Sequence, residues 1–168
     1  MGVCGVGKTT VAKACGEQFC SGFVEADDYH PPENIKAMRK GIPLTDEMRW
    51  GWLDRVATAV LAEQKTKPKP IFLACSGLKK SYRDWLRRAL GQMPVILLTA
   101  ERGLLEGRMT ERDDHFMPPE LLGSQLEALE IPEERLEGAL HIDAGLPLRS
   151  IVSIISNHLR QKETAAEN

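Results

Sequence analysis

The opening segment, residues 2–9, constrains the fold of this chain more than any other. It reads Gly-Val-Cys-Gly-Val-Gly-Lys-Thr and satisfies the pattern G-x-x-x-x-G-K-[ST] in full. The glycines let the backbone turn tightly and direct successive N–H groups at one phosphate, and a helix that follows adds the positive end of its dipole. The pattern indicates a nucleotide site in which Lys8 contacts the β- and γ-phosphates and the Thr9 hydroxyl holds Mg²⁺. The residues expected to bind ATP are Gly2, Val3, Cys4, Gly5, Val6, Gly7, Lys8, Thr9 and Thr10.

Short apolar runs alternate with amphipathic stretches along the rest of the chain. Runs of this length predict strands buried on both faces of a parallel sheet, at residues 22–25, 71–75, 94–99 and 140–143. Helical periodicity predicts helices over residues 8–19, 46–64, 79–90, 101–111, 119–129 and 148–159. The alternation indicates an α/β, doubly wound fold with right-handed crossovers.

The start of the chain is unusual for such a fold. A nucleotide-binding loop of this kind is expected to follow a buried central strand, but only Met1 precedes Gly2. We therefore expect the first strand to be truncated. Downstream, residues 112–119 form a polar break bounded by proline, which predicts a mobile loop, and residues 161–168 predict a disordered polar tail.

Composition excludes several classes of protein. The 168 residues include 22 basic and 24 acidic side chains, a balance that argues against a nucleic-acid partner. The longest apolar runs are far shorter than a membrane-spanning helix, and no secretory signal is visible, so we expect no membrane association and a cytoplasmic location. The four cysteines have neither the spacing of a zinc site nor that of a disulfide framework.

Acidic residues follow the run at 22–25. Ligands of open α/β sheets bind at the carboxyl ends of the strands, so Asp27 is expected to accept a proton from a substrate hydroxyl or to orient that hydroxyl. The alternative is that Asp27, or more readily Asp28, caps the helix that begins near Pro31.

Two groups of basic residues lie at expected helix ends. Lys79 and Arg83 are four residues apart near a helix N-terminus, where cations are unfavourable, so they suggest an anionic ligand. Arg108 and Arg112 are also four residues apart and are expected to neutralise a phosphoryl group in transfer. The alternatives are a solvated basic face for the first pair and a structural helix-end pair for the second.

Several motifs together resemble the gluconokinase family. They are the loop at 2–9, Asp-Asp-Tyr-His-Pro-Pro-Glu-Asn at 27–34, Gly-Ile-Pro-Leu-Thr-Asp at 41–46, Cys-Ser-Gly-Leu-Lys-Lys-Ser-Tyr-Arg-Asp at 75–84, His-Phe-Met-Pro-Pro-Glu-Leu-Leu at 115–122 and Ser-Gln-Leu-Glu-Ala-Leu-Glu at 124–130. The resemblance spans residues 2 to about 155. It implies a three-layer P-loop kinase fold with a central parallel sheet of about five strands, one domain over residues 1–160 and a lid around residues 108–122.

The resemblance also implies an activity and a set of site residues. The activity is ATP- and Mg²⁺-dependent phosphorylation of D-gluconate to 6-phospho-D-gluconate, by a protein that is usually a homodimer. The implied roles are catalysis by Lys8, Asp27, Arg108 and Arg112, substrate binding by Asp27, His30, Lys79, Arg83 and His115, and metal binding by Thr9 and Glu25.

This sequence departs from the family pattern at a few positions. Glu25 stands where the family commonly has Asp, and Asp114 stands where a glycine usually precedes His-Phe. These changes fall on the expected metal site and lid, and they favour the second of two alternatives that stay open. One is a related kinase for shikimate or a nucleoside monophosphate, and the other is a nucleotide-binding protein of weak catalytic activity.

Overall fold

A computed structural model of the chain describes residues 1–67, 70–110, 118 and 120–166. Its strands are β1 (Phe23–Glu25), β2 (Phe72–Ala74), β3 (Ile96–Thr99) and β4 (Leu140–Asp143). Its helices are α1 (Lys8–Gln18), the 3₁₀-helix η1 (Ala26–Tyr29), α2 (Pro32–Arg39), α3 (Asp46–Glu63), α4 (Lys80–Leu90), α5 (Arg102–Thr110), α6 (Leu121–Ala128), α7 (Glu134–Glu137) and α8 (Leu148–Ala166).

The four strands form two parallel pairs, β1 with β2 and β3 with β4. The first two residues of the chain lie between the pairs. Leu98 N donates a hydrogen bond to Met1 O at 3.0 Å, and Gly2 N donates to Ser76 O at 3.2 Å. A short segment therefore occupies the position of a central strand, and it leads directly into the loop at residues 2–9.

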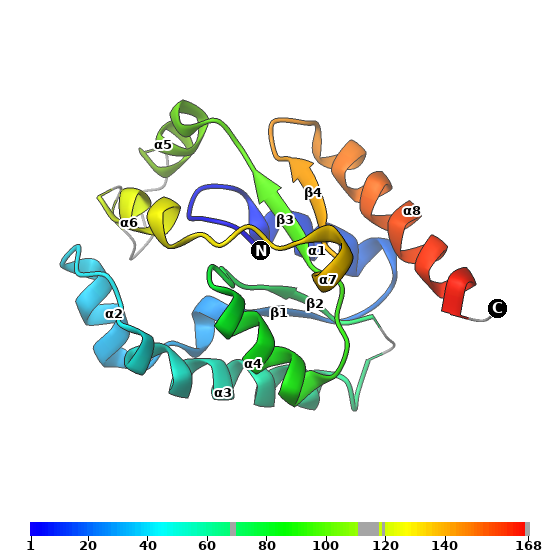
Figure 1. The fold of residues 1–168 in the computed structure, drawn as a ribbon, viewed down its shortest axis with the longest axis horizontal. Helices are drawn as coiled ribbons and strands as arrows, with labels where there is room; N and C mark the ends of the chain where they lie inside the picture. The colour runs from blue at the N-terminus through cyan, green and yellow to red at the C-terminus, as the bar shows by residue number, and fades with distance from the viewer. Residues whose placement is uncertain (68–69, 111–117, 119, 167–168) are drawn as a thin grey trace.

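Helices cover both faces of this β layer (Figure 1). On one side α3 packs against α4 and β1, and on the other α1 packs against β2 and α8. Each side has its own apolar core, the first around Trp52, Leu53 and Leu86 and the second around Val6 and Ile151. The architecture is the α/β fold that the alternation of apolar runs predicts, with the three layers that the family resemblance implies.

Most predicted elements agree with the structure to within a few residues, and two differences have a physical cause. The short helices η1 and α7 were not predicted, and α2 was expected only as a helix beginning near Pro31, because segments this short carry too few turns to show a helical period. Helix α8 extends to Ala166, beyond the expected start of the tail, because its last residues (Gln-Lys-Glu-Thr-Ala-Ala) include good helix formers.

Among the residues described here, no helix is long and apolar enough to cross a membrane. All four cysteines are free thiols, and burial raises the pKa of Cys15 and of Cys75 to about 11. The absence of disulfides agrees with the cysteine spacing.

A buried ion pair links α4 and α7. Arg83 and Glu137 are only 2% and 6% exposed. The guanidinium donates two parallel hydrogen bonds, from Nε to Oε2 at 2.7 Å and from Nη2 to Oε1 at 2.8 Å. Arg87 Nη1 adds a third contact to Glu137 at 3.0 Å. These cations hold the pKa of the Glu137 carboxyl at about 2, with the hydrogen bonds from Arg83 as the main cause.

We predict that Glu137→Ala destabilises the protein by about 3–5 kcal/mol, because the buried Arg83 then lacks its counter-ion. Urea unfolding followed by circular dichroism measures the change. Glu134→Ala, an exposed position on the same helix, is the matched control and should shift stability by less than about 0.5 kcal/mol. Equal losses in both variants would contradict the assignment.

Candidate functional site

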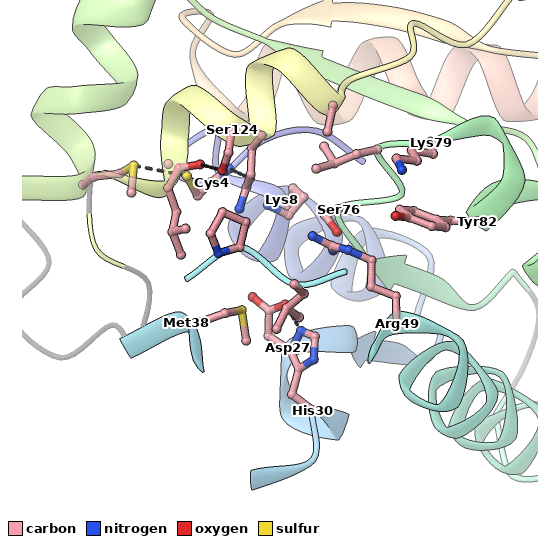
Figure 2. A pocket seen from close by; sticks show the side chains of 18 of the residues that line it. Cys4, Lys8, Asp27, His30, Met38, Arg49, Ser76, Lys79, Tyr82 and Ser124 are labelled. Carbon is pink, nitrogen blue, oxygen red and sulfur yellow. Dashed lines mark hydrogen bonds and ion pairs between the residues drawn. The ribbon is translucent and has the colours of Figure 1, made fainter. Parts of the chain in front are cut away.

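A cavity of about 150 Å³ opens at the carboxyl ends of the strands, between the loop at residues 2–9 and the starts of α3 and α4 (Figure 2). Figure 2 shows Lys8 and Arg49 pointing into the same space, with Asp27 and His30 on another side of it. The residues that line it include Cys4, Gly5, Gly7, Lys8, Thr9, Asp27, His30, Asp46, Arg49, Ser76, Lys79, Tyr82, Ser124 and Gln125. Parallel strands place their carboxyl ends on one edge, which explains how segments far apart in sequence meet here.

The loop from Gly2 to Lys8 has the backbone shape that its glycines allow. Gly2, Gly5 and Gly7 have φ angles of 141°, 76° and 94°, which L side chains rarely adopt. A Cβ atom on Gly2 would lie 2.6 Å from Leu98 O, and one on Gly5 would lie 2.9 Å from Leu105 O. Lys8 Nζ donates a hydrogen bond to Val3 O across the loop at 3.0 Å. The loop thus holds its amides and one ammonium group beside the cavity.

Thr9 and Glu25 bring two oxygen ligands together next to this loop. The Thr9 hydroxyl donates a 2.6 Å hydrogen bond to Glu25 Oε2. Burial raises the pKa of Glu25, and the hydrogen bond from Thr9 opposes that effect. A hydroxyl and one carboxylate suit Mg²⁺, which prefers oxygen ligands and completes its shell with water and substrate phosphates. Over the described part of the chain, no cluster of three or more His, Cys, Asp or Glu side chains offers an alternative metal site.

Asp27 and His30 sit on the short helix and turn that follow β1. His30 Nε2 lies 3.7 Å from Asp27 Oδ1, and its ring stacks on Trp52 with centroids 4.3 Å apart. Burial lowers the pKa of His30 to about 4, although Asp27 acts in the opposite direction. Helix α2 begins after Pro31 without a side-chain cap. The alternative role of Asp27 or Asp28 as its cap is therefore not what the structure shows.

Three polar side chains from α3 and α4 form the opposite wall with Lys79. Lys79 Nζ contacts both oxygens of Asp46, at 2.7 and 2.9 Å, and Tyr82 donates to Asp46 Oδ1 at 2.5 Å. These hydrogen bonds, that from Lys79 first, lower the pKa of Asp46. Arg49 lies one turn beyond Asp46, with its guanidinium 5.5 Å from the Tyr82 ring. Its Nε is buried and has no hydrogen-bond partner among the residues that the structure describes.

The structure brings together most of the predicted site residues and separates one of them. Arg83 lies apart from the cavity wall, against Glu137. The expectation that Lys79 and Arg83 share a helix face is wrong, because Lys79 precedes α4 with an extended backbone, at φ −94° and ψ 147°. Arg108 donates from Nη2 to Ala144 O at 2.9 Å, and its Nη1 lies 4.0 Å from the point where a Cβ on Gly7 would be. Arg112 and His115 fall outside the described residues.

Sequence reasoning missed Arg49, Asp46 and Gln125 as residues of the cavity. Asp46 ends the motif at 41–46, and Arg49 lies three residues later on the same helix. That spacing places both side chains on one face of α3, so the pattern D-x-x-R at a helix start was a usable signal. Gln125 is part of the motif at 124–130 and reaches the loop only through tertiary packing.

The chain is similar to curated gluconokinases. It is 44% identical over 137 residues to a probable gluconokinase of Schizosaccharomyces pombe, covering 79% of this chain and 71% of the relative. It is 36% identical over 176 residues to the thermosensitive gluconokinase of Escherichia coli, covering 100% of this chain and 94% of the relative. No family model matches the chain.

Solved structures give the same result. A sugar kinase from Janibacter superposes with a TM-score of 0.86 at 39% identity, over 95% of this chain and 91% of that one. A gluconokinase from Sinorhizobium meliloti superposes with a TM-score of 0.79 at 39% identity, over 99% and 93%. A shikimate kinase at 15% identity, over 95% and 96%, has a TM-score of 0.60 and shares the fold alone. The fold is that of the P-loop kinases.

We predict that His30 stays neutral down to about pH 5, because its burial against Trp52 lowers its pKa to about 4. The unfolded chain binds this proton near pH 6.5, so His30 contributes stability above pH 6.5, and that contribution is lost as the pH falls towards 4. The gap between the two pKa values corresponds to about 3 kcal/mol at most. An NMR titration of the ring should give a midpoint near 4, and His30→Gln should flatten the dependence of stability on pH in this window. A midpoint above 6 would contradict the prediction.

Proposed function

This chain belongs to the gluconokinase family, and from that premise we propose how the cavity carries out the reaction. The protein is an ATP-dependent kinase that phosphorylates D-gluconate to 6-phospho-D-gluconate. One observation supports our assignment of residues: the nucleotide-binding loop, the carboxylate of Asp27 and the cations Arg49 and Lys79 all line the same cavity. A kinase needs this arrangement, because both substrates must meet in one water-poor space.

We assign the binding of the ATP phosphates to the loop amides and to Lys8. Among the described residues, no side chain accepts a hydrogen bond from the amides of Gly5, Val6 and Gly7, so these N–H groups can donate to phosphate oxygens. Lys8 Nζ is held near the loop by Val3 O, and it can exchange that carbonyl for a phosphate of greater negative charge. Arg108, which lies beside Gly7, is assigned to the neutralisation of charge on the group in transfer.

Thr9 and Glu25 are the residues that would hold Mg²⁺. Bound there, the ion supplies positive charge that neutralises the phosphate oxygens. Glu25 carries one methylene more than the Asp that this position commonly has in the family, yet its carboxylate reaches the Thr9 hydroxyl at 2.6 Å. The longer side chain therefore preserves the pairing of the two oxygen ligands.

Asp27 is assigned to the nucleophile, the 6-hydroxyl of gluconate. Its carboxylate accepts the hydroxyl hydrogen, which directs the oxygen lone pair at the γ-phosphorus. As the new P–O bond forms and the bond to the ADP oxygen breaks, the hydroxyl proton passes to Asp27 and later to water. His30 is the neighbour of Asp27 at 3.7 Å, and because it is neutral above pH 5 it orients the substrate by hydrogen bonding rather than by charge.

The carboxylate of gluconate is assigned to Arg49 and Lys79. The unpartnered Nε of Arg49 can donate one hydrogen bond to a carboxylate oxygen in the cavity. Lys79 is held in place by Asp46, so its position is set before the substrate binds. Arg83 is then a positioning residue that supports the segment before α4, instead of a direct contact to the substrate.

The remaining assignments follow from the family alone. Arg112 and His115 are proposed to act from a lid around residues 108–122. We also propose a single domain over residues 1–160, a homodimer and a cytoplasmic location.

The activity is tested by a coupled assay of ADP release with and without gluconate. We expect release only when gluconate and Mg²⁺ are both present. Asp27→Asn should lower kcat roughly 10²- to 10⁴-fold, because it removes the proton acceptor, while the Kd for ATP changes little. ATP binding without gluconate-dependent ADP release would instead indicate a nucleotide-binding protein, and equal losses of kcat and ATP affinity would contradict the role of Asp27.

We predict that Arg49→Leu raises the KM for gluconate roughly 10- to 100-fold and leaves the KM for ATP unchanged, because it removes a charged donor to the substrate carboxylate. Steady-state kinetics with each substrate varied in turn measures the effect. Arg55→Leu is the matched control, since Arg55 is exposed on the same helix. A parallel rise in both KM values would remove Arg49 from the carboxylate site.

A further inference from the structure

The segment from Gln125 to Glu130 contacts both substrate-binding halves of the cavity. It comprises the end of α6 and the two residues after it, and it lies within the motif at 124–130. The side chains of Gln125 and Glu130, at its two ends, accept hydrogen bonds from backbone amides of two different elements.

Gln125 bonds to the nucleotide-binding loop. Its side-chain oxygen, Oε1, accepts a 2.8 Å hydrogen bond from Cys4 N, which lies in the middle of that loop. The bond spans 121 positions in sequence. It holds one amide of the loop and leaves those of Gly5, Val6 and Gly7 for phosphate oxygens.

Apolar packing supports the same contact. Leu122 belongs to the core cluster that contains Val3 and Val6 from the loop, and the partly buried Leu126 packs against that cluster. Because α6 packs on the loop as well as bonding to it, Gln125 has a fixed base from which to hold the backbone of Cys4.

Glu130 forms a hydrogen bond with the start of α4, beside Lys79, the side chain assigned to the substrate carboxylate. Its Oε2 accepts a 2.5 Å hydrogen bond from Lys80 N, and its own N–H donates to Leu78 O at 2.9 Å. Helix α4 has no cap from the side chain of its own N-cap residue, Lys79. Glu130 therefore supplies the carboxylate that a helix N-terminus favours. Arg83 Nη1 donates a hydrogen bond to Glu130 O at 3.0 Å, which holds the backbone of Glu130 in place.

We propose that Gln125 and Glu130 are two positioning residues, the first for the nucleotide-binding loop and the second for Lys79 at the start of α4. This inference rests on the proposed function of the cavity. It names the contacts that position the nucleotide-binding loop and the start of α4. The two contacts are five residues apart on one short segment, but each side chain bonds to only one half of the cavity, Gln125 to the loop and Glu130 to the start of α4. Loss of either side chain should therefore weaken the binding of one substrate and spare the other.

The test is a split between the two Michaelis constants. Gln125→Met removes the acceptor at similar size and should raise the KM and the Kd for ATP about 5- to 20-fold, with the KM for gluconate within about twofold of wild type. Glu130→Ala should do the reverse, raising the KM for gluconate about fivefold with ATP binding within about twofold. Glu127→Ala, an exposed position on α6, is the matched control and should change neither constant.

Hydrogen exchange at a single amide distinguishes the proposed contact from a general effect on stability. Hydrogen exchange of the Cys4 amide should accelerate in Gln125→Met and stay unchanged in Glu130→Ala. If Gln125→Met does not fold, Gln125→Asn, which falls one methylene short of Cys4, provides the same readouts.

Equal changes of both constants in each variant, or an ATP affinity unaltered by loss of the Gln125 acceptor, would overturn the proposal. These outcomes differ from a failure of the proposed function, in which the wild-type protein itself would release no ADP in response to gluconate.

Discussion

The geometry of the cavity depends on the hydrogen bonds that the buried guanidinium of Arg83 donates. Besides its bidentate pair with Glu137, Nη1 donates to three carbonyl oxygens, those of Gly77, Leu78 and Glu130. These carbonyls belong to the chain segments that leave β2 and α6. An arginine buried in this way needs its charge and donors satisfied, and here that requirement fixes two segments that have no regular secondary structure of their own. The substrate side of the cavity is built on those segments.

Most of the cations that line the cavity have a hydrogen-bond or ion-pair partner within the protein. Two cations near the substrate position already have a local partner. Lys8 donates a hydrogen bond to the carbonyl of Val3, and Lys79 forms an ion pair with Asp46. Such partners keep the side chains ordered and stop them from repelling one another, but an anionic ligand can compete with them. Arg49 is the exception, because its Nε is buried without a hydrogen-bond partner in the described structure. A buried donor of this kind is costly unless a ligand satisfies it, which supports its assignment to the gluconate carboxylate.

The sequence predicted the layers of the fold and the loop at residues 2–9, because each depends on local chemistry. A glycine pattern determines a loop shape, and an apolar run of four to six residues indicates a buried strand. Asp27 was found in the same way, since it directly follows such a run. The prediction for Arg83 went wrong because it assumed that α4 already includes Lys79. Whether a helix starts one residue earlier is decided by a distant carboxylate, Glu130, which bonds to Lys80 N.

From the sequence alone, then, the nucleotide-binding loop, the α/β alternation and the position of Asp27 at a strand end are determined, because neighbouring residues specify them through backbone freedom and hydrophobic period. Only the tertiary structure decided that Arg83 supports the site from within the core while Arg49 points into the cavity. It also decided that Gln125 holds the loop across 121 positions of sequence. These roles depend on which charged or polar group finds a partner in the packed molecule, and no local pattern encodes that choice.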